Sequence, residues 1–268
     1  ITEAAKQLFV SQPTVTSAIH DLEKEMQIVI FVRTNKGVIL SEDGERFLGH
    51  ARQVLEQVDL IEGIYKNDVV SKPHFAVSCQ HYSFAVNAFV DLIRRFDAYQ
   101  YDFTIREEQT HEIIEDVTNL KSELGVIYLS SKNTEVLSKM LKRNELEFAE
   151  LFTATPHVFI CDSHPLAKKK SIAMEDLQDY PYLTYEQGEY NSQYFSEEFV
   201  STLDSRKNIR VRDRATLFNL IIGLNGYTVC SGVISAELNG RNIISKPLDV
   251  EEYMQIGIIT RKGVVLSR

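Results

Sequence analysis

The first forty residues constrain the fold most, because they combine two short helical patterns, a turn and a hairpin pattern. Small and apolar residues recur at helical spacing from Ala4 to Phe9, which predicts an amphipathic helix that ends at Val10. Ser11 is a favourable N-cap and Pro13 suits a first helical turn, so a second helix is predicted to begin there. The two segments together predict a helix-turn-helix.

The predicted second helix has one apolar face, and its opposite face is polar, short and uncharged. Amide and hydroxyl side chains of that kind can hydrogen-bond to base edges in a major groove. A hairpin is predicted to follow, with a strand pattern at 28–33, turn residues at 35–37 and a return strand that reaches Leu40. Arg33 and Lys36 flank its turn, where they can contact phosphates. A purely structural helix-turn-helix is the alternative, and the cationic hairpin favours DNA binding over it.

These residues follow the pattern AA-x-x-L-x-x-SQP-x-V-[ST]-x-x-I-x-x-LE and then F-x-R-T-x-[KR]-G-V-x-L-[ST]. The pattern resembles the N-terminal domain of LysR-type transcriptional regulators, over residues 1 to about 66. The chain begins inside the second helix of that family module, so the first helix of the motif is absent from the sequence. By resemblance, the residues aligned to the recognition helix and wing are Ser11, Gln12, Pro13, Thr14, Thr16, Ser17, His20, Arg33 and Lys36.

The charge balance sets a limit on how this module binds DNA. The chain carries a net charge of -9, and residues 1–66 hold seven Lys and Arg against ten Asp and Glu. Non-specific attraction to phosphate is therefore expected to be weak, and dimerisation is expected to matter for affinity. We see no signal peptide and no apolar stretch suited to a bilayer, which predicts a cytoplasmic protein without a membrane partner.

A long helix is predicted from Ser41 to Tyr65, with apolar residues spaced by four and three as in a coiled-coil seam. Such a stripe needs a partner. Packing on its own chain is the alternative, and a second copy is favoured because no other helix has a matching seam. The expected assembly is a homo-oligomer, a dimer or a tetramer, and a dimer would present two groove helices to two half-sites.

Strand and helix patterns alternate after residue 72, which predicts an α/β multidomain fold. We expect a winged helix-turn-helix DNA-binding domain at 1–40, N-terminally incomplete, and a linker and dimerisation helix at 41–71. An effector-binding domain is expected at 72–268, two-lobed and similar to periplasmic binding proteins. Lobe one is predicted at about 72–152 and 245–268, and lobe two at about 153–244. Ser192 to Leu203 is predicted to be a helix of lobe two, and Ile256 to Thr260 a late strand that rejoins lobe one.

Ligands of open α/β sheets bind beyond the carboxyl ends of the strands, so the residues that follow each strand are candidates for an effector site. Most of them are neutral hydrogen-bonding groups, which suits a small polar metabolite, and the resemblance implies a co-inducer there. The overall look of the lobe sequence suggests amino-acid or sulfur metabolism as its source. The candidate effector-binding residues are Ser78, Gln80, His81, Tyr82, Gln109, Thr110, Tyr128, Gln187 and Asn191.

Other classes of protein fit the sequence less well. Ser163 and His164 stand side by side, but without a nucleophile-elbow or triad motif, so no enzymatic activity and no catalytic residue is predicted. The three cysteines are isolated and the histidines lack metal-ligand spacing, so no metal and no cofactor is expected. A two-lobed small-molecule receptor without DNA binding is the remaining alternative to a DNA-binding regulator controlled by a metabolite, and the first forty residues argue against it.

Overall fold

The computed structural model describes residues 1–35, 37–65, 73–96, 100–190, 192, 194–198 and 205–264. The chain divides into two compact units, Ile1–Ser71 and Lys72–Arg268, and each is described by itself. We call them the DNA-reading unit and the effector unit.

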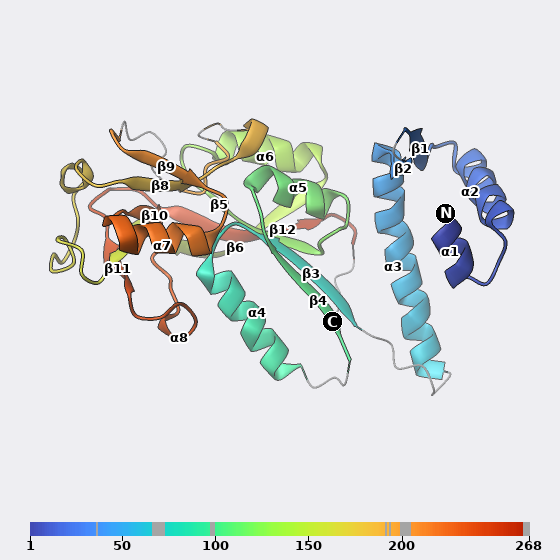
Figure 1. Ribbon diagram of the computed structural model, residues 1–268, viewed down its shortest axis with the longest axis horizontal. Helices are drawn as coiled ribbons and strands as arrows, with labels where there is room; N and C mark the ends of the chain where they lie inside the picture. Colours follow the sequence, from blue (N-terminus) through green and yellow to red (C-terminus); the bar gives the residue numbers. More distant parts are fainter. Residues whose placement is uncertain are drawn as a thin grey trace. The chain divides into compact units, whose positions relative to one another are not determined.

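The DNA-reading unit has three helices and a hairpin among its described residues (Figure 1). The elements are α1 (Thr2–Gln7), α2 (Gln12–Met26), β1 (Phe31–Thr34), β2 (Gly37–Leu40) and α3 (Glu42–Tyr65). Helix α1 ends earlier than predicted, because Phe9 adopts a left-handed conformation with φ 55° and its side chain is 96% exposed. The sequence pattern could not register this, since Phe9 continues the apolar spacing.

Helix α2 begins as predicted. Ser11 is its N-cap, and the Ser11 hydroxyl accepts a hydrogen bond from the Thr14 amide at 3.3 Å. The Glu23 carboxylate then accepts hydrogen bonds from the amides of Ile30 at 2.7 Å and Phe31 at 3.0 Å. These bonds lower the pKa of Glu23 and fix the hairpin to the helix. The first hairpin strand therefore starts at Phe31, three residues later than predicted.

Helix α3 is also tied to the hairpin. The Ser41 hydroxyl accepts a hydrogen bond from the Gly44 amide at 2.8 Å and donates one to the Val29 carbonyl. Gly44 lies so close to the hairpin that a Cβ there would be 2.1 Å from the Ile30 carbonyl oxygen. Only glycine permits this approach of helix and chain.

The main sheet of the effector unit has the strand order β4-β3-β5-β12-β6. Its strands are β3 (His74–Cys79), β4 (Asp102–Glu107), β5 (Leu124–Leu129), β6 (Leu146–Ala154) and β12 (Met254–Arg261). Strands β3, β4 and β5 are parallel, whereas β12 runs antiparallel to β5 and β6. The late strand predicted at 256–260 is thereby confirmed.

Helices cover both faces of this sheet (Figure 1). They are α4 (Ser83–Arg95), α5 (Thr110–Thr118) and α6 (Thr134–Arg143). Val126 and Tyr128 of β5 pack in a core with α4, while the alternating Ile127 and Leu129 pack in a second core with α5 and α6. Burial on both faces explains why this strand reads as a continuous apolar run.

The second part of the effector unit contains the sheet β10-β7-β11 and the parallel pair β8-β9. Its elements are β7 (His157–Cys161), η1 (Met174–Leu177), β8 (Tyr182–Tyr185), η2 (Gly188–Tyr190), β9 (Asn208–Val211), α7 (Arg214–Leu224), β10 (Thr228–Cys230), α8 (Ala236–Asn239) and β11 (Ile243–Pro247). Strand β11 pairs with β7 as far as Pro247, so the chain returns to the main sheet after 247 and not at about 245.

The helix predicted at 192–203 is wrong for its described residues. Residues 192 and 194–198 form turns and bends, and the other positions lie outside the described residues. Ser196 and Glu198 instead use their side chains in buried hydrogen bonds, which an exposed helical face could not provide.

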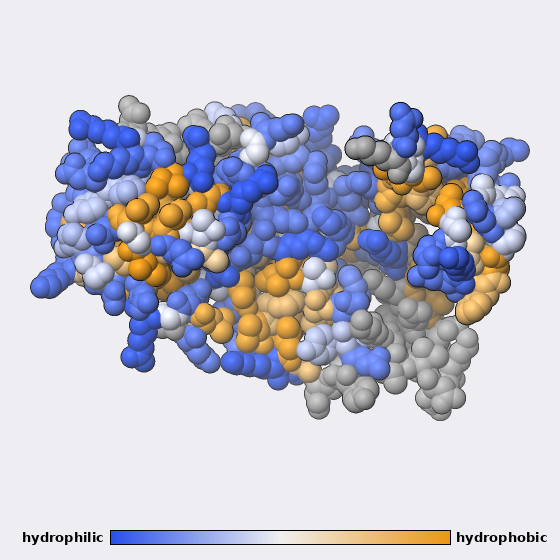
Figure 2. Space-filling view, in the orientation of Figure 1, coloured by the Kyte–Doolittle hydropathy of each residue, from blue (hydrophilic) through white to orange (hydrophobic). Residues whose placement is uncertain are grey.

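One apolar core runs through both sheets of the effector unit. Val77 and Ile256 of the main sheet belong to the same buried cluster as Val158, Ile160 and Val229 of the second sheet. Apolar side chains also reach the surface. Figure 2 shows them over α4 and α7, where Leu92, Ile222 and Leu224 are 39, 43 and 47% exposed.

Candidate functional site

The residues proposed to read DNA gather on the N-terminal half of α2 and on the hairpin. All of the described ones are exposed except Thr16, which is partly buried. Lys36 lies outside the described residues. Because α2 carries no basic residue in its first turns, this surface offers hydrogen bonds and the helix dipole to DNA, with Arg33 as its described cation on the hairpin.

Several of these polar side chains already bond within the unit. The hydroxyls of Ser11 and Thr14 are 2.7 Å apart, and the Thr16 hydroxyl donates to the Gln12 carbonyl at 3.0 Å. The Gln12 side-chain oxygen accepts from Thr2 at 3.2 Å, which leaves the Gln12 amide group as a donor. Among the described residues we find no hydrogen-bond partner for the Ser17 hydroxyl. Gln12 and Ser17 therefore have the most hydrogen-bonding capacity left for bases.

A cavity lies in the effector unit between the main sheet and the second sheet. Its volume, measured with a water-sized sphere, is about 30 Å³, so the cavity is small in the present arrangement of the side chains. Its wall is formed by His81, Tyr82, Ser83, Phe159, Tyr185, Glu197, Glu198, Arg214, Leu217, Phe218, Thr228, Val229 and Cys230. The wall thus combines two acids and two basic groups with aromatic and apolar surface.

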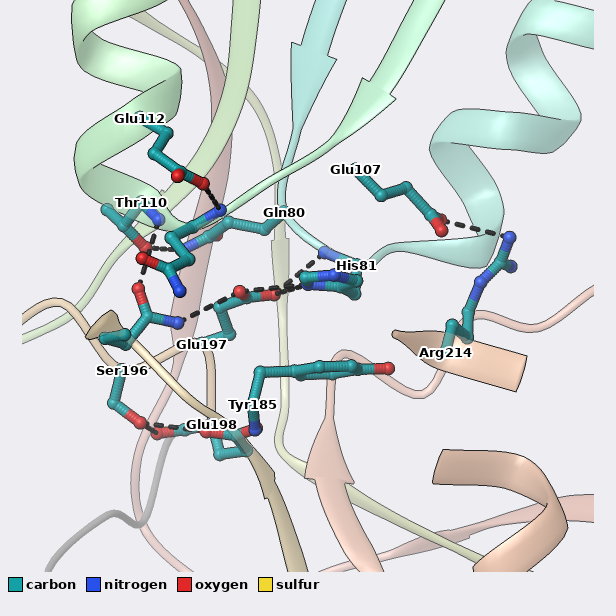
Figure 3. Close-up of polar contacts among 12 residues, drawn as sticks. Gln80, His81, Glu107, Thr110, Glu112, Tyr185, Ser196, Glu197, Glu198 and Arg214 are labelled. Carbon is teal, nitrogen blue, oxygen red and sulfur yellow. Dashed lines mark hydrogen bonds and ion pairs between the residues drawn. The ribbon is translucent and has the colours of Figure 1, made fainter. Parts of the chain in front are cut away.

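The Glu197 carboxylate is held at this cavity by three donors (Figure 3). The His81 amide donates to it at 2.8 Å, His81 Nδ1 lies 2.9 and 3.0 Å from its two oxygens, and Gln187 Nε2 donates at 3.0 Å. The side chains of His81 and Glu197 are each only 4% exposed. The His81 ring also stacks on Tyr185, with centroids 4.0 Å apart. We call this arrangement the carboxylate clasp.

His81 and Glu198 in the cavity wall, and Glu107 beside Arg214, have shifted pKa values. Burial alone would lower the pKa of His81, but the charge of Glu197 and its hydrogen bond outweigh burial and raise it. Burial, together with the charge of Glu197, raises the pKa of Glu198 to about 8. Burial also raises the pKa of Glu107, although Arg214 lies 3.0 Å from it and opposes the shift. The clasp therefore favours a protonated His81 and a neutral Glu198.

Four of the candidate effector residues form one hydrogen-bonded network beside the clasp. Gln80 donates to the Thr110 hydroxyl at 2.6 Å, and the Thr110 amide donates to Gln187 at 3.1 Å. Thr110 and Tyr128 also donate to main-chain carbonyls, those of Phe195 at 2.8 Å and Ser196 at 3.0 Å. The segment at 195–196 therefore accepts hydrogen bonds from polar groups that the sequence predicted to bind an effector.

The structure does not bring all the candidates together. The Ser78 hydroxyl bonds to Asp116 at 2.6 Å and lies 2.8 Å from that of Ser122, so it belongs to a separate polar cluster. Gln109 is the N-cap of α5. Tyr82 lines the cavity, and Asn191 lies outside the described residues.

Sequence reasoning found His81 but missed the two carboxylates and the arginine of the cavity. Glu197 and Glu198 fall in the segment that was predicted to be a helix, and Arg214 opens α7 more than a hundred residues after its ion-pair partner Glu107. The Glu-Glu pair beside Ser196 gives no motif that could have placed it at the cavity. No group of three His, Cys, Asp or Glu residues suited to a metal occurs in the part of the chain that the structure describes. None of the described helices is long and apolar enough to cross a membrane.

Two family models match the sequence. Residues 1–45 match the bacterial regulatory helix-turn-helix protein of the lysR family, and residues 77–268 match the LysR substrate binding domain. The HTH-type transcriptional regulator CysB of Burkholderia cenocepacia is 28% identical over 192 residues, which cover 69% of this chain and 58% of that relative. YbhD of Escherichia coli, an uncharacterized HTH-type transcriptional regulator, is 27% identical over 98% of this chain and 81% of its own length.

A solved structure shares the fold. A full-length OxyR from Pseudomonas aeruginosa superposes with a TM-score of 0.62 and 22% identity, over 97% of this chain and 83% of that one.

Proposed function

This chain belongs to the LysR family of transcriptional regulators, and from that premise we propose how its two units divide the work of regulation. It is a DNA-binding regulator with an effector-binding domain, and the family consists of regulators and not of enzymes. We propose that α2 and the hairpin contact a specific operator, while a small polar metabolite in the cavity controls that contact. Since its target is DNA, we assign it to the cytoplasm.

The proposed DNA contacts follow from the exposed face of α2. Gln12 and Ser17 read base edges, and Ser11 and Thr14 hold the helix end near a phosphate. Pro13, Thr16 and His20 complete that face. Arg33 and, by its sequence position, Lys36 contact phosphates beside the groove.

A second copy of the chain is proposed to pack on α3. Val54, Leu55, Val58 and Ile61 are 63, 62, 43 and 57% exposed and follow the spacing of a coiled-coil seam. An apolar stripe of this kind gains free energy when a matching stripe covers it. A dimer, alone or within a tetramer, then presents two α2 helices to two half-sites, which offsets the low positive charge of each.

The effector is proposed to bind at the cavity between the two sheets. The network of Gln80, Thr110 and Gln187 is linked to the cavity, because Gln187 donates a hydrogen bond to Glu197 in the cavity wall. The supporting observation is that both parts of the effector unit line the cavity: His81, which follows β3, from the first, and Phe159, Tyr185 and Thr228 from the second. A metabolite that touches both can favour one orientation of the two. Amino-acid or sulfur metabolism supplies small polar molecules of that kind.

Selection of duplexes from a random library by the full chain tests the proposal directly. We expect an enriched sequence with two half-sites about one helical turn apart. A library that stays random after selection, for a protein that is folded by circular dichroism, would contradict sequence-specific regulation. The alternative of a receptor without DNA binding predicts that random outcome.

A further inference from the structure

We propose that Glu197 is an internal ligand of the effector cavity, and that the effector is a small organic acid whose carboxylate takes the place of the Glu197 carboxylate in the clasp. This inference rests on the proposed function, because it assumes that the cavity between the two sheets is where the effector binds.

The clasp already has the donor set of a carboxylate-binding site. One main-chain amide, one imidazole and one side-chain amide converge on Glu197, at 2.8 to 3.0 Å. Charge-assisted hydrogen bonds of this length are the strong ones. Two of the donors come from His81, which follows β3 (Figure 3). The third comes from Gln187, which follows β8, so a carboxylate in the clasp joins the main sheet to the β8-β9 pair.

The charge of the site favours an acid that replaces the Glu197 carboxylate over an acid that binds in addition to it. Glu197 and Glu198 line the cavity, and Glu107 is ion-paired with Arg214 in its wall. Burial raises the pKa of Glu107 and of Glu198, which means that this site resists further negative charge. An added anion would meet that resistance. An acid that enters while Glu197 leaves for water keeps the charge of the clasp constant and keeps His81 paired.

The cavity also has hydrogen-bonding groups that the chain itself does not satisfy. The Tyr82 and Thr228 hydroxyls are buried without a hydrogen-bond partner among the described residues, and both residues line the same cavity as the clasp. The two residues are only 6 and 4% exposed. Buried hydroxyls without partners cost free energy, so a ligand that satisfies them gains from it. The expected acid therefore carries a second polar group besides its carboxylate.

An internal competitor lowers the apparent affinity for the effector. The measured dissociation constant equals the intrinsic one divided by the fraction of molecules whose clasp is empty. Glu197→Gln keeps the shape of the side chain but removes its charge, so it should empty the clasp more often. Acids should then bind about tenfold more tightly or better.

The experiment measures the affinity of the full chain for acetate and succinate by calorimetry, with acetamide and succinamide as neutral probes. Glu197→Gln and Glu197→Ala are compared with wild type, and Glu189→Gln is the matched control, because Glu189 lies exposed eight residues earlier. We expect both Glu197 variants to bind the acids more tightly than wild type and to ignore the amides. The control should bind like wild type.

Three results would overturn the inference: equal acid affinity in all proteins, weaker acid affinity in the Glu197 variants, or equal affinity for acids and amides. Weaker affinity would mean that Glu197 contacts the ligand directly instead of competing with it. Gln187→Met gives an independent check, since loss of a clasp donor should weaken acid binding. Binding of each protein to selected duplex DNA is measured separately, so a failed operator selection contradicts the proposed function while the acid affinities still decide this inference.

Discussion

The two units of this chain bury their side chains in opposite ways. Among its described residues, the DNA-reading unit buries two apolar side chains, Ala5 and Ile30, and exposes large apolar residues on α2, on both hairpin strands and on α3. The effector unit has three packed cores and also buries polar groups such as Gln80, Thr110 and Glu198. The DNA-reading unit therefore leaves apolar surface that another molecule can cover. The effector unit covers most of its apolar surface itself, and its own Glu197 occupies the clasp.

The strongest test of this contrast is a charge on the α3 stripe. Val58→Glu places a carboxylate where a second copy should pack, and an uncompensated buried charge costs about 3–5 kcal/mol. The dimer dissociation constant, measured by sedimentation, should rise by at least about a hundredfold. Arg52→Gln changes the net charge by the same single unit, at an exposed position about 120° around the helix from Val58, and should leave the oligomer intact. An unchanged oligomer for Val58→Glu would show that α3 is not the main interface.

A methyl group at Gly44 should give the two units different melting temperatures in a thermal unfolding experiment. Gly44→Ala forces a Cβ against the Ile30 carbonyl, which should destabilise the DNA-reading unit by about 2–4 kcal/mol and leave the effector unit unchanged. Gly223→Ala is the matched control. A Cβ there meets nothing within 4 Å, so this change inside α7 should stabilise slightly. A single transition shifted as a whole would mean that the units unfold together.

Buried polar groups should make only the effector unit sensitive to alkaline pH. The pKa of Glu198 is raised to about 8 in the folded chain, so its contribution to stability is present at low pH and lost as pH rises through 8. His81 also has a raised pKa and shifts stability in the same direction. Stability should fall by about 2–3 kcal/mol between pH 6 and pH 9, and Glu198→Gln should remove most of that fall. Equal pH dependence in the variant would refute the assignment.

The smallest predicted effect concerns the exposed face of α2. Gln12→Ala should cost about 1–3 kcal/mol on the preferred operator and relax the preference at one base pair. Arg33→Ala should weaken all sequences alike and reduce the salt dependence by about one ion. Gln178→Ala, an exposed glutamine of the effector unit, serves as the control. If Gln12→Ala lowers binding to every sequence equally, Gln12 does not read bases.

The contrast between the units also explains what the sequence could reveal. Local sequence signals predict the elements of the DNA-reading unit. Ser11 caps α2, turn residues follow the strand pattern of the hairpin, and apolar residues at coiled-coil spacing indicate α3. Those elements were predicted, with two errors: α1 ends early at the left-handed Phe9, and the first hairpin strand starts late, where Glu23 binds the amides of Ile30 and Phe31.

The clasp depends on long-range placement and could not be predicted in the same way. His81 and Gln187 were found because each follows a strand, and strand ends are visible in a sequence. Their partner Glu197 lies 116 residues after His81 in an irregular segment, where neither period nor motif marks it. Ser78 is the opposite case. It was predicted as an effector residue because it lies at the end of a strand, but its hydroxyl bonds to Asp116.

The core that both sheets share limits how the effector unit can move. Only two connections join the sheets in the described chain, between β6 and β7 and between β11 and β12, and such a pair of crossings would permit wide opening by itself. Val77 and Ile256, however, are packed in one cluster with Val158 and Val229, and a close-packed interior yields little to compression or stretching. Replacement of the Glu197 carboxylate by that of an effector should therefore rotate one sheet relative to the other by a small angle. The effector unit should respond to its ligand with a small rigid-body rotation and not with a large closure.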